Sequence, residues 1–228
     1  MMADYLRLLS KAVKNPGKVP PFLHQRLFQP DNRKIEDGIV TWNTFDWGDG
    51  DTPAQIAAIN YHMVQALRDD LEGESIYHAV EIGSGYGRVT PWLTEFAKQV
   101  TGVEPNDEMR NLADQYYPDI RFIDAKAQNI PFDTDGVDFV FTRSVLQHIS
   151  EDDLKKACSE IARIAEPEAK ILLCEATEGE ENSGIYHPRT PKEYEELLSP
   201  FELQNVWKRE TPAKTREHNR ERMMFAQS

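Results

Sequence analysis

The central motif of this chain reads Val80-Glu81-Ile82-Gly83-Ser84-Gly85-Tyr86-Gly87-Arg88-Val89-Thr90. An apolar run enters three closely spaced glycines, and this order predicts a strand, a tight turn and then a helix over residues 88–98. Glycines adopt backbone angles closed to other residues and let a ligand lie against the main chain. The first N–H groups of the helix would point at that ligand. The motif therefore predicts a nucleotide-binding turn, and a tight turn without any ligand is the alternative.

A second apolar segment strengthens the ligand interpretation. Residues 100–103 form a short apolar run that ends at Glu104-Pro105, about twenty residues after the first glycine of the motif. In doubly wound folds an acidic residue at this position accepts hydrogen bonds from ribose hydroxyls. The spacing therefore indicates a ligand that carries a ribose.

Two further strands are expected, and polar residues stand where each of them ends. Residues 120–123 precede Asp124-Ala125, and residues 137–141 end near Arg143. Open α/β sheets bind ligands outside the carboxyl ends of their strands. All four strands thus finish on candidate functional residues.

The glycine spacing separates two classes of nucleotide ligand. A dinucleotide site has the pattern G-x-G-x-x-G, with its third glycine where helix and strand pack. Arg88 occupies that third position here, and Gly87 comes one residue early. The pattern E-x-G-x-G-x-G, together with Asp124-Ala125 after the third strand, resembles the first motif of class I S-adenosylmethionine-dependent methyltransferases. The resemblance covers residues 54 to 227.

The resemblance implies a set of cofactor-binding residues. The methionine moiety of S-adenosylmethionine would be surrounded by Glu81, Gly83, Ser84, Gly85 and Gly87. Glu104 would hold the ribose, Pro105 would also belong to the cofactor-binding set, and Asp124 and Ala125 match the positions that contact adenine. The segment 141–149, which includes Arg143, resembles the fourth-strand motif that borders both the methyl group and the acceptor.

The resemblance also implies the fold: a Rossmann-like α/β domain. Its seven-stranded, mostly parallel sheet would carry helices on both faces and a C-terminal antiparallel hairpin. We expect an N-terminal extension or lid over 1–53 and the methyltransferase domain over 54–228. Where many relatives have a Pro-Gly-Gly turn before the fifth strand, this chain has Glu166-Pro167-Glu168-Ala169, and we expect a turn there, far from the chemistry.

Composition limits the partners of the protein. The 228 residues carry a net charge of −13, and so acidic a chain would repel a polyanion, which disfavours a bulk nucleic-acid substrate. No apolar run reaches the roughly 20 residues needed to cross a bilayer. With no secretory signal at its start, we expect the protein in the cytoplasm.

The charge is unevenly distributed. Residues 1–34 carry a net charge of +5 and the remainder −18. Residues 4–14 are expected to form a short amphipathic helix. The basic and apolar arm 1–34 would either pack over the domain or contact an anionic membrane surface peripherally.

Cysteine and histidine spacing gives no sign of a metal. Cys158 and Cys174 lack the C-x-x-C spacing of a redox or zinc site, and the six histidines are scattered. We therefore expect no bound metal ion.

Two histidines are candidate catalytic residues. His148 follows the fourth strand, and His187 lies on the loop after the fifth strand. An alcohol acceptor must lose a proton as the new bond forms, and histidine suits that role. A packing or loop role is the alternative for each. Arg143, Arg189 and the basic residues of 208–220 could hold an anionic acceptor, or 208–220 could be a solvated loop.

Three functions are compatible with the sequence. The preferred one is O-methylation of a small molecule or glycan, such as a sugar or lipid-linked sugar. The second is a nucleotide-dependent oxidoreductase, which Arg88 at the third-glycine position disfavours. The third is a catalytically silent methyltransferase-like scaffold protein, against which the intact glycines, Glu104 and Asp124 argue.

Overall fold

The computed structural model describes residues 33–36, 39–42, 53–178, 186–208 and 220–227. The chain divides into two units, Met1–Asp51 and Thr52–Ser228, which are taken separately below. The predicted helix over 4–14 and most of the basic arm lie outside the described residues. The predicted boundary between 1–53 and 54–228 stays a prediction.

The first unit contains an antiparallel strand pair that the sequence analysis did not anticipate. Strand β1 (Arg33–Glu36) pairs with β2 (Ile39–Trp42), with Arg33 opposite Trp42. The missed signal is the dipeptide Asp37-Gly38 between the two segments, because Asp-Gly is typical of a two-residue hairpin loop.

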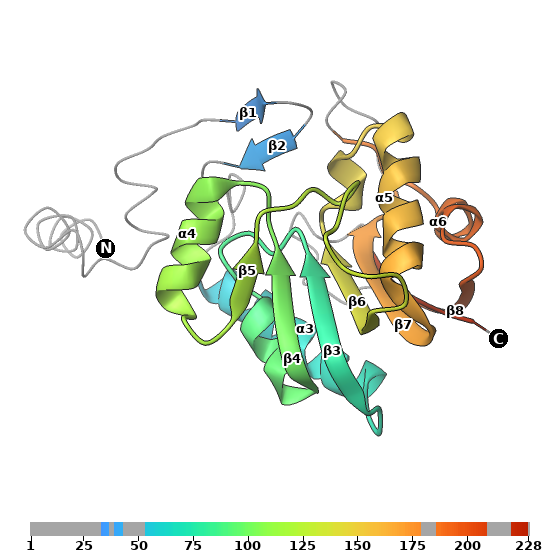
Figure 1. Ribbon diagram of the computed structural model, residues 1–228, viewed down its shortest axis with the longest axis horizontal. Coiled ribbons are helices and arrows are strands. Elements are labelled where there is room, and N and C mark those ends of the chain that lie inside the picture. Colours follow the sequence, from blue (N-terminus) through green and yellow to red (C-terminus); the bar gives the residue numbers. More distant parts are fainter. Residues whose placement is uncertain (1–32, 37–38, 43–52, 179–185, 209–219, 228) are drawn as a thin grey trace, which may run out of the picture. The chain divides into compact units, whose positions relative to one another are not determined.

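The second unit is built on a seven-stranded sheet with the order β5-β4-β3-β6-β7-β9-β8. Strands β3 to β7 are parallel, whereas β9 runs antiparallel to β7 and β8 antiparallel to β9. The predicted fold class is therefore confirmed, including the C-terminal hairpin (Figure 1). The strands are β3 (Ile76–Ile82), β4 (Ala97–Val103), β5 (Arg121–Ile123), β6 (Val137–Arg143), β7 (Ala165–Ala176), β8 (Glu202–Lys208) and β9 (Arg220–Ala226).

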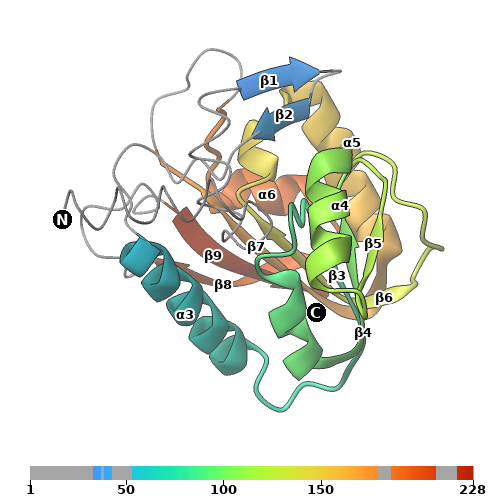
Figure 2. The same ribbon diagram turned by 90° about the vertical axis from the view of Figure 1, so that its left-hand side faces the viewer.

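Helices cover both faces of the sheet. Figure 2 shows α3 on one side of it and α4 and α5 on the other. The α-helices of this unit are α3 (Pro53–Asp70), α4 (Asp107–Tyr116), α5 (Glu151–Ile164) and α6 (Pro191–Leu197). Two short 3₁₀ helices, η2 (Thr90–Glu95) and η3 (Leu146–His148), follow β3 and β6.

Side chains alternate between two cores along the central strands, as the period of a strand requires. On β6, Val140 packs with the core under α5, whereas Phe139 and Phe141 pack with the core under α3. Helix α5 contributes buried residues at helical spacing, namely Leu154, Ala157, Cys158, Ile161 and Ile164. Both faces of the parallel sheet are thus buried from solvent, which explains the near-continuous apolar runs of its strands.

The helix expected over 88–98 was wrong in length and type. The chain forms only the 3₁₀ helix η2, and β4 already begins at Ala97. Pro91 starts this helix, and the β-branched Val89, Thr90 and Thr94 disfavour a longer α-helix. Six residues of 3₁₀ helix do not supply the N–H cluster that the sequence analysis expected, so the glycine turn must bind through its own groups.

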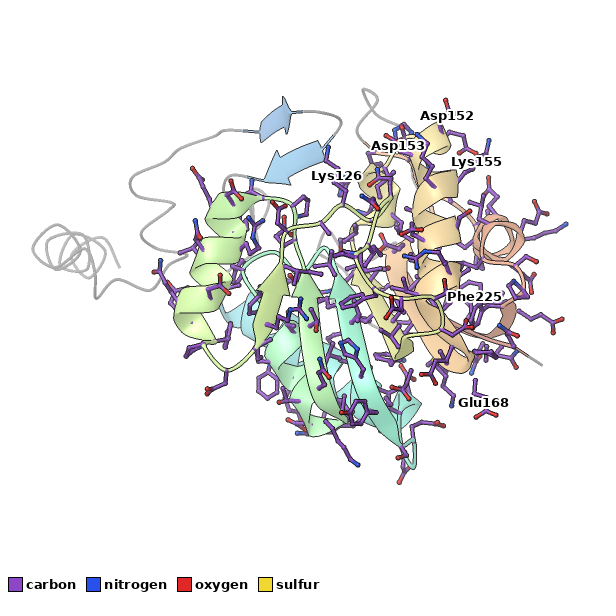
Figure 3. All side chains as sticks on the ribbon, in the orientation of Figure 1. Lys126, Asp152, Asp153, Lys155, Glu168 and Phe225 are labelled. Carbon is purple, nitrogen blue, oxygen red and sulfur yellow. The ribbon has the colours of Figure 1, made fainter. Side chains whose placement is uncertain are left out.

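The turn expected at Glu166-Pro167-Glu168-Ala169 was also wrong, because these residues lie inside β7. They form an irregularity: Val137 pairs with Ala165, but Phe139 pairs with Lys170, so β7 holds extra residues there. Figure 3 shows Glu168 at the opposite end of the sheet from Asp152 and Asp153 at the start of α5. The irregularity is therefore remote from the carboxyl ends of the strands.

Candidate functional site

The candidate site lies along the carboxyl ends of the parallel strands. The glycine turn follows β3, Glu104 follows β4, Asp124 follows β5, and Arg143 and Glu175 stand at the ends of β6 and β7. Because β3 lies between β4 and β6 in the sheet, the topology places the glycine turn at the centre of this edge.

The glycine turn depends on left-handed backbone angles. The φ angles of Gly83, Gly85 and Gly87 are +71°, +56° and +79°. The N–H groups of Gly83 and Ser84 donate to the Val103 carbonyl at 2.8 and 3.1 Å, which ties the turn to the end of β4. Other residues pay roughly 1–2 kcal/mol to adopt such angles, so the turn selects glycine.

The three glycines face different surroundings. A Cβ atom at Gly83 would lie 2.2 Å from Val145 Cγ2, and one at Gly87 would lie 2.9 Å from Tyr117 Cδ2. A Cβ at Gly85 would meet no atom within 4 Å. Gly83 and Gly87 are therefore required by packing of the protein itself, whereas Gly85 opens onto space that a ligand can fill.

Ser84, between these glycines, provides a second sign of a ligand. Its Oγ is buried and has no hydrogen-bond partner among the described residues. A buried hydroxyl without a partner costs free energy. A polar ligand group at the turn would satisfy it.

Glu104 stabilises the glycine turn and can also accept hydrogen bonds from a ligand. Its Oε2 accepts a hydrogen bond from Gly85 N–H at 2.8 Å, and its Oε1 accepts one from Asn106 N–H at 2.9 Å. Burial raises the pKa of Glu104, and these two N–H groups limit the rise. Each carboxylate oxygen can accept a second hydrogen bond, so the group can still bind a diol. Pro105 is half-buried directly after it.

Glu81 and Arg143 are buried charged groups near the turn. Glu81 is 3% exposed and accepts a 2.5 Å hydrogen bond from Thr90 Oγ1. Burial raises the pKa of Glu81 to about 7, against the opposing effects of Thr90, Arg88 and Arg143. Arg143 is 5% exposed. The pair supplies one acidic and one basic group beside the turn, which suits a zwitterion such as an amino acid moiety.

The predicted adenine residues differ in exposure. Asp124 is 68% exposed and lies 3.4 Å from Arg110 Nη1, whereas Ala125 is buried. Arg110 also donates to the Glu104 carbonyl at 2.8 Å. Arg110 thus connects the residues that follow β4 and β5, and the sequence analysis missed it.

The two candidate histidines both lie next to Gln147, which the sequence analysis did not single out. The Nε2 atoms of Gln147 and His148 are 3.1 Å apart, and His187 N–H donates to the Gln147 carbonyl at 2.7 Å. The His148 ring also lies against Tyr186, with centroids 6.0 Å apart. The structure therefore brings the segments after β6 and β7 together, and the catalytic role of either histidine stays a prediction.

Arg189 does not have the environment of an acceptor-binding residue. It is 6% exposed, and its guanidinium donates to the carbonyls of Leu146, His187 and Ile149 at 2.9–3.1 Å. Glu151 lies 3.6 Å from its Nε. The suggestion that Arg189 holds an anionic acceptor is thus replaced by a structural role. Most of the basic loop 208–220 lies outside the described residues.

Neither a metal cluster nor a membrane span is found within the described ranges. No group of three or more His, Cys, Asp or Glu side chains there could hold a metal ion. None of the helices in the same part of the chain is long and apolar enough to cross a bilayer.

Comparison with known proteins identifies the family. A family model described as a methyltransferase domain matches residues 80–173, the part of the chain that runs from β3 into β7. Residues 80–173 are a methyltransferase domain of the class I S-adenosylmethionine-dependent kind. Its cofactor is S-adenosylmethionine. The open space at Gly85, the buried Ser84 hydroxyl and the buried carboxylate of Glu104 fit this cofactor.

The individual relatives of this chain are distant. An uncharacterised methyltransferase of Oceanobacillus iheyensis is 27% identical over 120 residues, which are 53% of this chain and 56% of that protein. A ubiquinone/menaquinone biosynthesis C-methyltransferase of Campylobacter jejuni is 29% identical over 86 residues, 38% of this chain and 36% of its own length. The chain thus spans about half, or less, of these curated relatives.

A solved structure extends the likeness in fold. The 1,6-didemethyltoxoflavin-N1-methyltransferase of Burkholderia thailandensis, with bound 1,6-didemethyltoxoflavin and S-adenosylhomocysteine, has a TM-score of 0.62 and 18% identity. It covers 80% of this chain, and 84% of that protein is covered in return. At this identity the likeness concerns the fold of the methyltransferase domain alone.

Proposed function

We propose that this protein transfers the methyl group of S-adenosylmethionine to a small-molecule acceptor. The proposal rests on the turn Gly83–Gly87, where Gly85 opens onto free space beside the buried groups Ser84 and Glu104. When bound, the cofactor supplies a methyl carbon activated by a positive sulfonium. The protein's own part is to position the reactants and exclude water.

Each proposed cofactor residue would make a contact suited to its chemistry. Glu104 would accept hydrogen bonds from the ribose, while Glu81 and Arg143 would face the charged ends of the methionine moiety. Asp124 and Ala125 would lie beside the adenine. The acceptor would bind near the segments after β6 and β7, where His148 and His187 both adjoin Gln147.

The class of acceptor is the less constrained part of the proposal. The names of two relatives specify a carbon acceptor and a nitrogen acceptor, whereas the sequence analysis favoured a hydroxyl of a sugar or lipid-linked sugar. The basic residues behind that preference lie mostly in 1–34 and 208–220, and Arg189 is used within the protein. A small molecule therefore takes precedence over a glycan in the proposal.

An acceptor screen tests the proposed activity. The full chain is incubated with S-adenosylmethionine and, in turn, a phenol, a quinol, a heterocyclic amine and a uronic acid, and release of S-adenosylhomocysteine is measured. We expect release with one class of acceptor and none from Gly85→Arg, whose side chain would fill the open space. Binding of S-adenosylhomocysteine without release, for every acceptor and for cell extracts, would favour the silent scaffold.

A further inference from the structure

The side chain of Gln147 makes two polar contacts in a buried place. Gln147 is 1% exposed, its Oε1 accepts a hydrogen bond from Ala176 N–H at 2.7 Å, and its Nε2 lies 3.1 Å from His148 Nε2. The Ala176 bond fixes which end of the amide is which, because a backbone N–H can only donate. The end that faces His148 is therefore the NH₂ group.

The orientation of this amide determines how His148 is protonated. An amide NH₂ group donates and cannot accept, so His148 Nε2 must be the acceptor of the hydrogen bond. A neutral imidazole carries one proton, on the nitrogen that is not the acceptor. Neutral His148 therefore carries its proton on Nδ1, and its Nε2 lone pair is engaged by Gln147.

Gln147 is held in place by a buried carboxylate. Glu175 is fully buried and accepts hydrogen bonds from Thr142 Oγ1 at 2.8 Å, Val145 N–H at 3.0 Å and Gln147 N–H at 3.3 Å. These bonds support the sharp turn at Ser144, whose φ is +59°. The donors left unpaired where β6 ends are thereby satisfied.

The backbone on both sides of Gln147 is also tied down. Arg189 donates to the carbonyls of Leu146 and Ile149, and Gln147's own carbonyl accepts from His187 N–H. Rotation of the Gln147 side chain would leave the buried Ala176 N–H without an acceptor, which is unfavourable because a buried donor loses its only partner. The contact between Gln147 and His148 is therefore built into the fold.

We propose that Gln147 is a positioning residue that holds neutral His148 as the Nδ1–H tautomer. One ring nitrogen then bears the proton and the other has its lone pair bound, so His148 provides a hydrogen-bond donor and no general base. This replaces the base role suggested by the sequence. The functional part of the inference rests on the proposed methyl transfer, whereas the tautomer does not.

The inference narrows the acceptor class. A methyl group passes to a lone pair or carbanion as the bond from methyl carbon to sulfur breaks, with that bond's electrons going to sulfur. Without a base at His148, His187 is the remaining candidate base. An amine, which can release its proton to water after transfer, or an atom already ionised in solution is the acceptor that needs neither histidine. An unactivated sugar hydroxyl would need His187 to take its proton.

Nitrogen NMR tests the tautomer without cofactor or acceptor. The full chain is labelled with ¹⁵N-histidine, and long-range ¹H–¹⁵N correlations are recorded at a pH where histidine is neutral. The His148 signals are those lost in His148→Gln. We expect the pattern of an Nδ1-protonated ring, and an Nε2-protonated ring would overturn the proposal.

The near-isosteric variant Gln147→Glu replaces the hydrogen-bond donor opposite His148 Nε2 with an acceptor. Gln147→Glu keeps an acceptor for Ala176 N–H but places a carboxylate oxygen opposite His148 Nε2, so the proton should move to Nε2. In Gln204→Glu, the matched control on exposed β8, the His148 spectrum should stay unchanged. Failure of His148 to change in folded Gln147→Glu would contradict the proposal, and the wild-type spectrum alone decides it if that variant does not fold.

Activity adds a separate readout. If methyl transfer is found, Gln147→Glu should change the pH dependence of kcat relative to the wild type, because the His148 proton moves to Nε2 and Nδ1 then presents a lone pair. An expected tautomer without turnover on any acceptor would overturn only the proposed function. Turnover by a wild type with an Nε2-protonated ring would overturn only the role of Gln147.

Discussion

Glu81 illustrates how a single residue of the site is shaped by its surroundings. Its carboxyl group is 3% exposed and has a hydroxyl partner in Thr90. Burial disfavours the charged form more than Thr90, Arg88 and Arg143 favour it, so the pKa of Glu81 rises from 4.5 to about 7. Folding without ligand is therefore opposed by ionisation of this group at neutral pH.

This shift predicts a pH-dependent effect of Glu81→Gln on stability. Below pH 4.5 Glu81 is protonated in both folded and unfolded states, and between 4.5 and about 7 only the unfolded state ionises. The wild type thus loses stability as the pH rises through this window, by about 3 kcal/mol in total. The amide of Glu81→Gln does not titrate. The free energy of unfolding of this variant, relative to that of the wild type, should therefore rise by roughly 2–3 kcal/mol between pH 5 and pH 8.

Urea unfolding of the ligand-free protein at the two pH values measures this gain. Glu160→Gln is the matched control, because Arg163 lowers the pKa of Glu160. The stability that ionised Glu160 provides is present above its unfolded pKa and is lost only at lower pH. The difference in free energy of unfolding between Glu160→Gln and the wild type should therefore change little between pH 5 and pH 8. An equal difference between Glu81→Gln and wild type at both pH values would refute the account of Glu81.

At the scale of elements, the sequence predicts the strands well and their contacts poorly. The strands β3 to β6 are visible because each apolar run ends at glycine or at polar residues, and α5 because its apolar residues repeat at helical spacing. The short η2 and the irregular start of β7 depend on local backbone choices that periodicity does not capture. The glycine turn could be predicted from its spacing, since that signal is local, and its contact with the cofactor stays a prediction.

The contacts among Gln147, Glu175 and Arg189 could not be assigned in the same way. Glu175 lies 28 positions from Gln147 along the chain, and Arg189 lies 40 positions from Ile149, whose carbonyl it contacts. These segments meet in space because β7 pairs with β6. A charged residue inside the apolar run of β7 was the one available sign, since a buried carboxylate requires partners. Which partners it finds depends on the sheet topology.

Arg189→Lys tests whether these segments are joined as described. A lysine ammonium cannot reach three separate carbonyls in the plane of a guanidinium, so the carbonyls of Leu146 and Ile149 would lose their donor. We expect a loss of about 2 kcal/mol in the free energy of unfolding, measured with urea. Arg121→Lys, at the exposed first residue of β5, is the conservative control and should change stability little. Unchanged stability with weakened acceptor binding would instead restore the anionic-acceptor role of Arg189.

At the scale of the whole molecule, the described core belongs to one unit. Both hydrophobic cores draw their residues from positions 63 to 225, within Thr52–Ser228. The proposed cofactor residues also lie within this unit. Most of the chain's negative charge lies after residue 34, so the unit with the site is the strongly acidic part.

This distribution predicts that residues 52–228 fold alone and bind the cofactor product. We expect a cooperative unfolding transition and an affinity for S-adenosylhomocysteine within roughly three-fold of the full chain, a difference below 1 kcal/mol. Circular dichroism and calorimetry of the fragment and the full chain provide the comparison. A folded fragment that no longer binds would mean that residues 1–51 contribute to the site.

The central claim is that the glycine turn holds S-adenosylmethionine, and calorimetric titration with S-adenosylhomocysteine tests it most directly. The full chain should bind at micromolar concentration and should not bind NADH. A side chain starting at Gly85 meets no protein atom within 4 Å at its Cβ, and the strain of a φ of +56° costs only roughly 1–2 kcal/mol. Gly85→Arg should therefore remain folded but lose binding. Equal binding by Gly85→Arg, or binding of NADH in place of S-adenosylhomocysteine, would contradict the account.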